Sequence, residues 1–221
     1  MTTMKRPRGG MTWAEYEVWL KETGQYEEMV ERHRKIDEEQ AKRKAEYRRA
    51  EAPLVEELRA AGFQVQSVWD FVNTRDSYPK ALPILLAHLP KPYPAAIREG
   101  IARALAVRET KALGWDMLLR LYREEQECRS KEGLAVAIAE AADGEVLDDV
   151  IAVLRDTSHG ESRGLLLKVL EKSKEPRAHA TLVELANDPD LYKEIKVIIK
   201  RLERKMERKL ARTKERKQKM Q

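Results

Sequence analysis

The chain has 221 residues, of which 37% are charged and 42% hydrophobic, and its formal net charge at pH 7 is +5. That length suits one ordinary domain, or a small domain with an extended arm. Alanine, leucine, glutamate, lysine and arginine are abundant, which favours helices and argues against most β architectures. No apolar stretch approaches the roughly 18 residues that a membrane-spanning helix needs, so we expect no membrane protein. The start, MTTMKRPRGG, lacks the apolar segment of a secretory signal, and the single Cys128 permits no internal disulfide, so we expect a cytoplasmic protein.

The positive charge is concentrated at the C-terminal end. Residues 200–221 contain 11 lysines and arginines against three glutamates, a local net charge of +8. The rest of the chain therefore carries a net charge of −3. A nucleic-acid partner, which the overall charge suggests, would thus concern this last segment rather than the whole protein.

The first 52 residues predict a flexible start followed by a helical arm. Residues 1–11 contain proline and glycine and are expected to be flexible. Thr12 and Glu15 have the spacing of a capping box, so a short helix is expected to begin there and to end at Gly24. From residue 25 the sequence is nearly all charged, with acidic residues four positions before basic ones, which predicts a solvated helix of roughly 40 Å. Pro53 is expected to end that helix, so that the arm covers residues 12–52.

A sequence repeat follows the arm. Three segments, residues 97–106, 130–139 and 161–170, align on Gly100, Gly133 and Gly164, at spacings of 33 and 31 residues. A degenerate fourth copy covers residues 193–202, with Ile195 at the glycine position. Each copy follows another helical segment, and an earlier pair is predicted on either side of Gly62. The partner segments are residues 81–89, 113–122, 146–155 and 178–187, and the earlier pair is 54–61 with 65–72. One amphipathic hairpin cannot bury its apolar face alone, whereas stacked hairpins share a continuous core.

With its basic residue early in each second helix, namely Arg98, Lys131 and Arg163, this repeat resembles HEAT-repeat proteins of the short bacterial type. The family pattern also places an aspartate in the turn between the helices, where this chain has other residues. The resemblance implies an all-α fold, a right-handed α-solenoid of HEAT-like hairpins, and a scaffold that binds partners along its concave face. The domains we expect are a flexible start (1–11), the arm (12–52), the repeat domain (53–202) and a basic helix or tail (203–221).

Motifs that carry chemistry are missing from the sequence. It contains no glycine-rich phosphate loop, HExxH, CxxC pair, GxSxG or EF-hand loop. The four histidines are far apart, and we expect His88 and His159 to be an ordinary packed residue and a turn residue. Cys128 is placed near a helix start, where the dipole lowers a thiol pKa, but it lacks a patterned base. We therefore expect no catalytic residue, metal site, cofactor or small-molecule substrate.

A DNA glycosylase built from HEAT-like repeats is the one enzyme that the pattern suggests. Such enzymes combine a basic concave face with aromatic and acidic residues, and Trp69 with Asp70 and Trp115 with Asp116 are superficially similar. Residues 53–187 carry a net charge of −3, however, where a DNA-wrapping surface is expected to be positive. Both tryptophans also fit apolar helical stripes, so we favour core packing.

Three surfaces are candidates for binding a partner. The first is the ridge formed by the second helices, which we expect either to bind an acidic protein segment or only to bridge neighbouring repeats: Arg98, Arg103, Lys131, Arg163, Lys168 and Lys172. The second is the aromatic helix, expected to cap the repeats or to dock into another protein: Trp13, Tyr16, Trp19, Leu20 and Tyr26. The third is the basic tail, expected to attract phosphates or acidic partners: Arg201, Arg204, Lys205, Arg208, Lys209 and Arg212.

We therefore expect a non-enzymatic scaffold or adaptor that binds another protein. It would be a subunit of a larger assembly or an inhibitor or immunity-type protein. The alternative is a nucleic-acid-associated protein that uses the tail and the ridge, with weak, nonspecific affinity through the tail. A glycosylase is the remote alternative.

Overall fold

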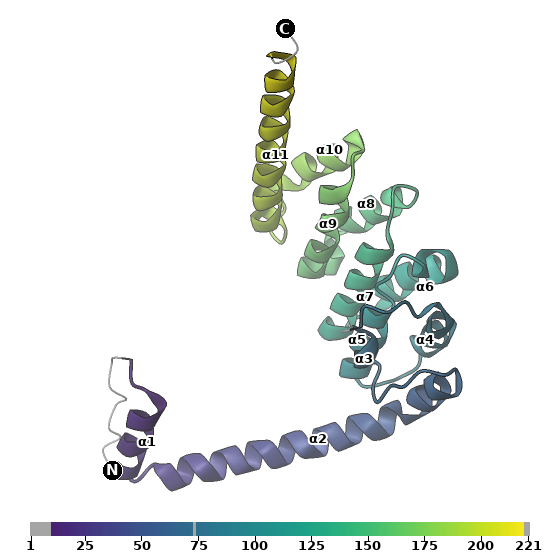
Figure 1. Cartoon of the computed structure of the whole chain (residues 1–221). Coiled ribbons are helices and arrows are strands. Elements are labelled where there is room, and N and C mark those ends of the chain that lie inside the picture. Colours follow the sequence, from purple (N-terminus) through teal and green to yellow (C-terminus); the bar gives the residue numbers. More distant parts are fainter. Residues whose placement is uncertain (1–9, 73, 219–221) are drawn as a thin grey trace. The chain divides into compact units, whose positions relative to one another are not determined.

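The computed structural model describes residues 10–72 and 74–218 and contains only helices, turns and loops in these ranges (Figure 1). The prediction of an all-α protein is therefore confirmed. The chain divides into two compact units, Met1–Ala50 and Glu51–Gln221. Within the described residues, no helix is both long and apolar enough to cross a membrane.

Unit 1 contains helix α1 (Trp13–Glu22) and the first part of helix α2 (Tyr26–Ala60). The predicted capping box is present, because the amide of Glu15 donates to the Thr12 hydroxyl (3.3 Å) and the Thr12 amide donates to the Glu15 carboxylate (2.8 Å). Gly24 follows α1 with φ 68°, a left-handed conformation that favours glycine. The expected flexible start lies mostly outside the described residues, which begin at Gly10.

Pro53 does not end the helix, so this prediction was wrong. Helix α2 continues through Pro53 to Ala60, and the expected boundary between residues 52 and 53 falls inside it. A proline inside a helix loses one backbone hydrogen bond and costs about 3 kcal/mol. Burial of apolar side chains in the same two turns offsets that cost: Leu54, Val55 and Leu58 are at most 6% exposed. Gly62, with φ 95°, then terminates the helix.

The second helix of the expected first pair is also shorter than predicted. Helix α3 covers only Trp69–Val72, because the segment before it is held in a turn. The Asp70 carboxylate accepts hydrogen bonds from the amides of Gln66 (2.8 Å) and Ser67 (3.2 Å). The buried carboxylate of Glu51, on α2, accepts from the amide of Val68 (2.5 Å), and burial raises its pKa. Glu51 thus joins the end of α2 to the start of α3.

The remaining helices of unit 2 follow one another as hairpins. Their bounds are η1 (Pro79–Ala81), α4 (Leu82–His88), α5 (Ala95–Ala104), α6 (Thr110–Glu124), α7 (Cys128–Ala141), α8 (Leu147–Arg155), η2 (Thr157–Leu166), α9 (Leu167–Lys172), α10 (Pro176–Glu184), η3 (Leu185–Asn187) and α11 (Tyr192–Gln218). Helix α5 packs against α7, α7 against η2 and α9, and α9 against α11. Figure 1 shows α5, α7 and α9 on one side of the unit, with α4, α6, α8 and α10 on the other.

The third copy of the repeat begins differently from the prediction. Residues 157–166 form the 3₁₀ segment η2, and the α-helix α9 starts only at Leu167. Asp156 caps η2 by accepting from the Ser158 amide (3.0 Å), and Gly160 has φ 58°, which an α-helix does not allow. Gly133, in contrast, lies in regular helix α7 and permits close packing. A Cβ there would come within 3.0 Å of the Glu99 carbonyl oxygen on α5.

Ion pairs connect each hairpin to the next at a nearly constant sequence separation. Among the described residues, seven pairs join residues 27 to 30 positions apart, which is close to one repeat: Arg98–Glu125, Glu99–Arg129, Glu140–Lys168, Asp148–Arg177, Arg155–Glu184, Arg163–Asp190 and Glu171–Arg201. Successive hairpins therefore lie against one another in the same register. Most of these pairs are partly exposed, so they set register more than they add stability.

Candidate partner-binding surfaces

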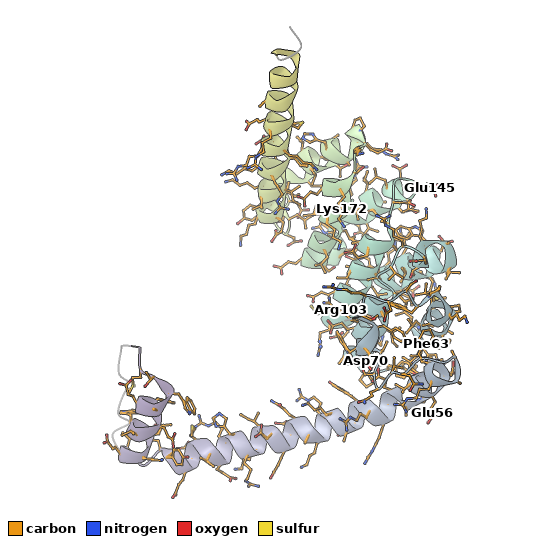
Figure 2. The ribbon with its side chains drawn as sticks, in the orientation of Figure 1. Glu56, Phe63, Asp70, Arg103, Glu145 and Lys172 are labelled. Carbon is orange, nitrogen blue, oxygen red and sulfur yellow. The ribbon has the colours of Figure 1, made fainter. Side chains whose placement is uncertain are left out.

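The ridge is the face of unit 2 formed by α5, α7, η2, α9 and the start of α11. On α5, the first helix of the ridge, Arg98 forms an ion pair with Glu125. Arg103 donates to the Glu99 carboxylate (2.9 Å), and the same carboxylate accepts from Arg129 on α7 (2.9 Å). Glu99 thus holds two arginines from adjacent helices. Figure 2 shows Arg103 on this side of unit 2, with Glu145 on the opposite side.

The predicted lysines of the ridge also make contacts within the chain. The Lys131 ammonium donates to the Glu125 carbonyl oxygen (3.1 Å) and lies 5.4 Å from the centre of the Tyr122 ring. Lys168 and Lys172 both pair with Glu140, which lies on α7. Lys168 and Lys172 thus share one carboxylate, and Lys131 is held by a carbonyl oxygen and a ring, so all three lysines are engaged within the chain. The contacts favour the bridging role that the sequence left open.

Arg163 does not belong to the exposed ridge, which corrects the prediction. Its side chain is 0% exposed, and the guanidinium pairs with Asp188 (2.8 Å) and Asp190 (2.9 Å). It also donates to the carbonyl oxygens of Leu154 (2.8 Å) and Gly160 (3.0 Å). The guanidinium holds the pKa of Asp188 below its usual range. Arg163 is therefore unavailable to a partner.

An open cleft of about 460 Å³ lies on the ridge between α5, α7, η2 and the start of α11. It is lined by Arg103, Glu132, Glu161, Ser162, Gly164, Leu165, Pro189, Asp190, Tyr192, Lys193 and Glu194. Two of its large side chains are unusually exposed for apolar groups: Leu165 is 37% and Tyr192 is 45% exposed. Sequence reasoning missed this cleft. No local signal marks it, because Ile101 and Leu134 occupy the position of Leu165 in the other copies and are buried.

The side chains that the sequence suggested for catalysis, Trp115 and Cys128, make contacts within the fold. The indole of Trp115 is 8% exposed and donates to Asp149 (2.8 Å) rather than to its neighbour Asp116. Cys128 is exposed, and its hydrogen bond to Glu132 raises the thiol pKa, which is the reverse of the predicted dipole effect. Among the described residues, no group of three potential metal ligands is close enough to hold an ion.

Two histidines are buried. The imidazole of His88 lies 2.6 Å from the Tyr93 hydroxyl and 3.0 Å from the Glu57 carboxylate, consistent with the expected packed histidine. His159 packs edge-on against the ring of Tyr122, and burial lowers its pKa. Its position inside the fold fits the turn interpretation rather than contact with a partner.

The aromatic helix α1 has an exposed apolar side. Trp13 is 64% exposed, and Val18 is 54% exposed, whereas Leu20 is buried. The rings of Tyr16 and Trp19 stack with centroids 5.8 Å apart. A shallow pocket here is lined by Met11, Ala14, Glu15, Val18, Trp19 and Glu22. Of the predicted docking residues, Tyr26 instead lies under the Lys21 ammonium (4.8 Å).

The basic tail begins on the exposed side of α11. Ile195 and Ile198 are buried, and helical spacing places the lysines and arginines at 193, 196, 200, 204 and 208 on the opposite side. Of the predicted phosphate contacts, Arg201 pairs with Glu171 (2.6 Å), whereas Arg204, Lys205 and Arg208 are exposed. The side chains of Lys209 and Arg212 lie outside the described part of the chain. This stripe is suited to an anionic surface.

No protein-family model, curated protein or solved structure matches this chain.

Proposed function

We propose that this chain is a non-enzymatic scaffold that binds another protein through the ridge of a HEAT-like α-solenoid. The seven ion pairs at separations of 27 to 30 residues support stacked hairpins of one repeat length. Stacking of this kind produces an extended face, which suits the binding of a protein segment. A cytoplasmic subunit of a larger assembly and an inhibitor or immunity-type protein both fit this proposal.

The cleft on the ridge is the observation that carries the proposal. Leu165 and Tyr192 expose apolar surface at its edge, although neighbouring positions on the same helices are buried in the core. Exposed apolar side chains grouped in a concavity are typical of sites that bind partners. Most of the predicted basic residues of the ridge already contact groups of neighbouring helices. The cleft is therefore the part of the ridge where carboxylates and apolar side chains are accessible without such contacts.

Co-purification followed by reconstitution tests the proposal. The full chain is isolated from its own cells, the accompanying proteins are identified, and binding is remeasured with both components purified. We expect Leu165→Glu to weaken the purified complex at least tenfold, because it places a charge on the apolar edge of the cleft. Val183→Glu is the matched control, since Val183 on α10 is also exposed (55%) but lies outside the cleft. Equal loss with both variants, or no loss with either, would overturn the proposal.

Nucleic-acid binding through α11 is the second candidate, favoured by the exposed basic stripe on that helix. A fluorescence-polarisation titration with duplex DNA and with RNA, at two salt concentrations, separates the cases. Weak electrostatic attraction should disappear near physiological salt, because binding releases condensed counterions. Affinity that survives physiological salt, and that falls in the double variant Lys200→Glu with Arg204→Glu, would favour the nucleic-acid function.

The glycosylase reading has little support from the site contacts. Trp115 is occupied by its hydrogen bond to Asp149, and Asp70 accepts two backbone amides in the turn before α3. We therefore keep the non-enzymatic proposal. Release of alkylated bases from damaged DNA by the purified chain would contradict it.

A further inference from the structure

We infer that the cleft on the ridge binds a basic protein segment in which lysine or arginine residues flank an apolar side chain. This inference rests on the proposed function and adds the chemistry of the partner. It differs from both sequence-based interpretations of the ridge, which were binding of an acidic segment or only bridging of neighbouring repeats.

The pairing of charges along the ridge is the first observation. Outside the cleft, each ridge carboxylate that faces a neighbouring helix has a cationic partner. The pairs are Glu99 with Arg103 and Arg129, Glu125 with Arg98, Glu140 with Lys168 and Lys172, and Glu171 with Arg201. Of the basic residues predicted on the ridge, Arg98, Arg103, Lys168 and Lys172 thus each contact a carboxylate within the chain, although Glu99 and Glu140 are each shared by two cations.

Inside the cleft the balance is different. Glu161 and Glu194 have no ion-pair partner among the described residues, and Glu132 contacts only the thiol of Cys128 (3.5 Å). The other acidic group, Asp190, is neutralised by Arg163 (2.9 Å). Three carboxylates therefore remain uncompensated on the walls of one concavity. Their field extends beyond the cleft, since the negative charges of Glu132 and Glu161 contribute to the raised pKa of Cys128.

The cations of the cleft offset these carboxylates only in part. Arg103 is engaged by Glu99 (2.9 Å). Lys193 lines the cleft without a carboxylate partner among the described residues and lies 5.7 Å from the centre of the Tyr192 ring, so its charge offsets one of the three carboxylates. A cationic side chain supplied by a partner would gain from the remaining negative charge.

The apolar edge of the cleft indicates that the partner segment also contains an apolar side chain. Leu165 is 37% exposed beside Pro189 and Tyr192, so the edge offers contact area that only an apolar side chain uses well. A nucleic acid does not fit these groups, because its phosphates would be repelled by the carboxylates. An acidic peptide is disfavoured for the same reason.

The chain's own basic tail cannot supply the segment within one molecule. Tyr192, which lines the cleft, is also the first residue of α11, and the helix is continuous to Gln218. At about 1.5 Å rise per residue, residue 204 lies about 18 Å farther along the axis and away from the cleft. The proposed occupant is a segment of another protein, and a second copy of this chain becomes an outcome to be tested.

Selection from a random peptide library displayed on phage, with the full chain as bait, tests the inference. We expect the selected peptides to contain lysine or arginine on both sides of an aliphatic or aromatic residue. Labelled synthetic copies are then titrated against wild type and the double variant Glu161→Gln with Glu194→Gln. Exposed charge pairs are each worth about a factor of 1.5 to 5, so we expect the double variant to bind about 2- to 25-fold more weakly at low salt. The matched control is Glu56→Gln with Asp116→Asn, which removes two exposed carboxylates on α2 and α6 (Figure 2 labels Glu56) and should leave binding unchanged.

Four results would overturn the inference: selection of acidic or purely apolar peptides, selection of no consensus, basic peptides that bind the double variant as well as wild type, and self-association through the cleft. Light scattering on the full chain reports the last, as a dimer that the double variant dissociates. The proposed function fails separately. If a co-purified partner is lost with Leu165→Glu but presents an acidic segment, the scaffold function stands and the partner chemistry is wrong.

Discussion

Arg163 and Asp188 form a bidentate ion pair in the interior of unit 2, with Nη1 2.8 Å from Oδ2 and Nη2 3.0 Å from Oδ1. The same guanidinium also donates to the carbonyl oxygen of Leu154 (2.8 Å), at the end of α8. Asp188 lies in the segment just before α11, so one side chain joins the third hairpin to the last helix. Its burial makes the pair important for folding rather than for binding.

Substitution of Arg163 by methionine should destabilise the protein by about 3–5 kcal/mol, because it leaves the buried Asp188 carboxylate without its partner. Urea denaturation followed by circular dichroism measures the change. Lys172→Met is the control: Lys172 is exposed, lies 3.6 Å from Glu140, and should cost no more than about 0.5 kcal/mol. Equal effects of the two substitutions would contradict the central role of Arg163.

Alanine should destabilise the protein at Gly133 but not at Gly164. A Cβ on Gly133 would come within 3.0–3.1 Å of the Glu99 backbone on α5, which cannot move aside as a flexible side chain would. We expect Gly133→Ala to destabilise by about 1–3 kcal/mol, despite the better helix propensity of alanine. At Gly164 the nearest atom, on Leu191, is 3.8 Å away, so Gly164→Ala should be neutral within about 0.5 kcal/mol. Thermal unfolding of both variants decides; a stabilising Gly133→Ala would show that α5 and α7 do not pack this closely.

His159 should make stability depend on pH below 6.5. Burial, followed by the positive charge of Lys131, lowers the pKa of the imidazole from 6.5, against a smaller opposite effect of Asp156. Just below pH 6.5 the unfolded chain therefore binds a proton that the folded chain does not. The free energy of unfolding falls as pH decreases through this window, by at most about 1.4 kcal/mol per pH unit.

Urea midpoints at pH 7.5 and 5.5 test this pH dependence. The difference between the two midpoints should be smaller in His159→Gln than in wild type. The control variant, His179→Gln, changes an exposed histidine of α10 and should retain the wild-type difference. An unchanged difference in His159→Gln would show that this imidazole does not titrate abnormally.

Deletion of residues 1–24 tests the role of the aromatic helix. If α1 caps the repeats, as the sequence predicts, the shortened chain should melt at a lower temperature in calorimetry. Trp13 and Val18 together expose much apolar surface, so the alternative is docking into a partner. If the melting temperature is unchanged and the co-purified partner is lost, the capping prediction is wrong and α1 docks into the partner.

Local signals in the sequence predicted much of the helical structure. The capping box at Thr12 and Glu15 and the stop at Gly24 each depend on a few adjacent residues. The termination at Gly62 was also correct, because a left-handed glycine ends a helix regardless of tertiary context. Repeat spacing located the second helices, since one repeat corresponds to one hairpin.

Features that depend on tertiary contacts could not be predicted in this way. Helix α2 passes through Pro53 because Leu54, Val55 and Leu58 are buried, and burial is not visible in local propensity. Arg163 directly precedes the aligned Gly164, whereas Arg98 and Lys131 lie two positions before their glycines, and its contact with Asp188 places it in the interior. The negative charge of the cleft depends on which carboxylates form ion pairs. Ion pairs between hairpins can be identified only from the folded structure.

Hydrogen exchange on the complex with the co-purified partner tests the central claim most directly. We predict that the partner slows amide hydrogen exchange in α7 near Glu132, in η2 near Leu165, and at the start of α11. Leu165→Glu should abolish this protection, whereas Val183→Glu should retain it. Protection confined to α1, or to α11 beyond residue 203, would contradict binding through the cleft on the ridge.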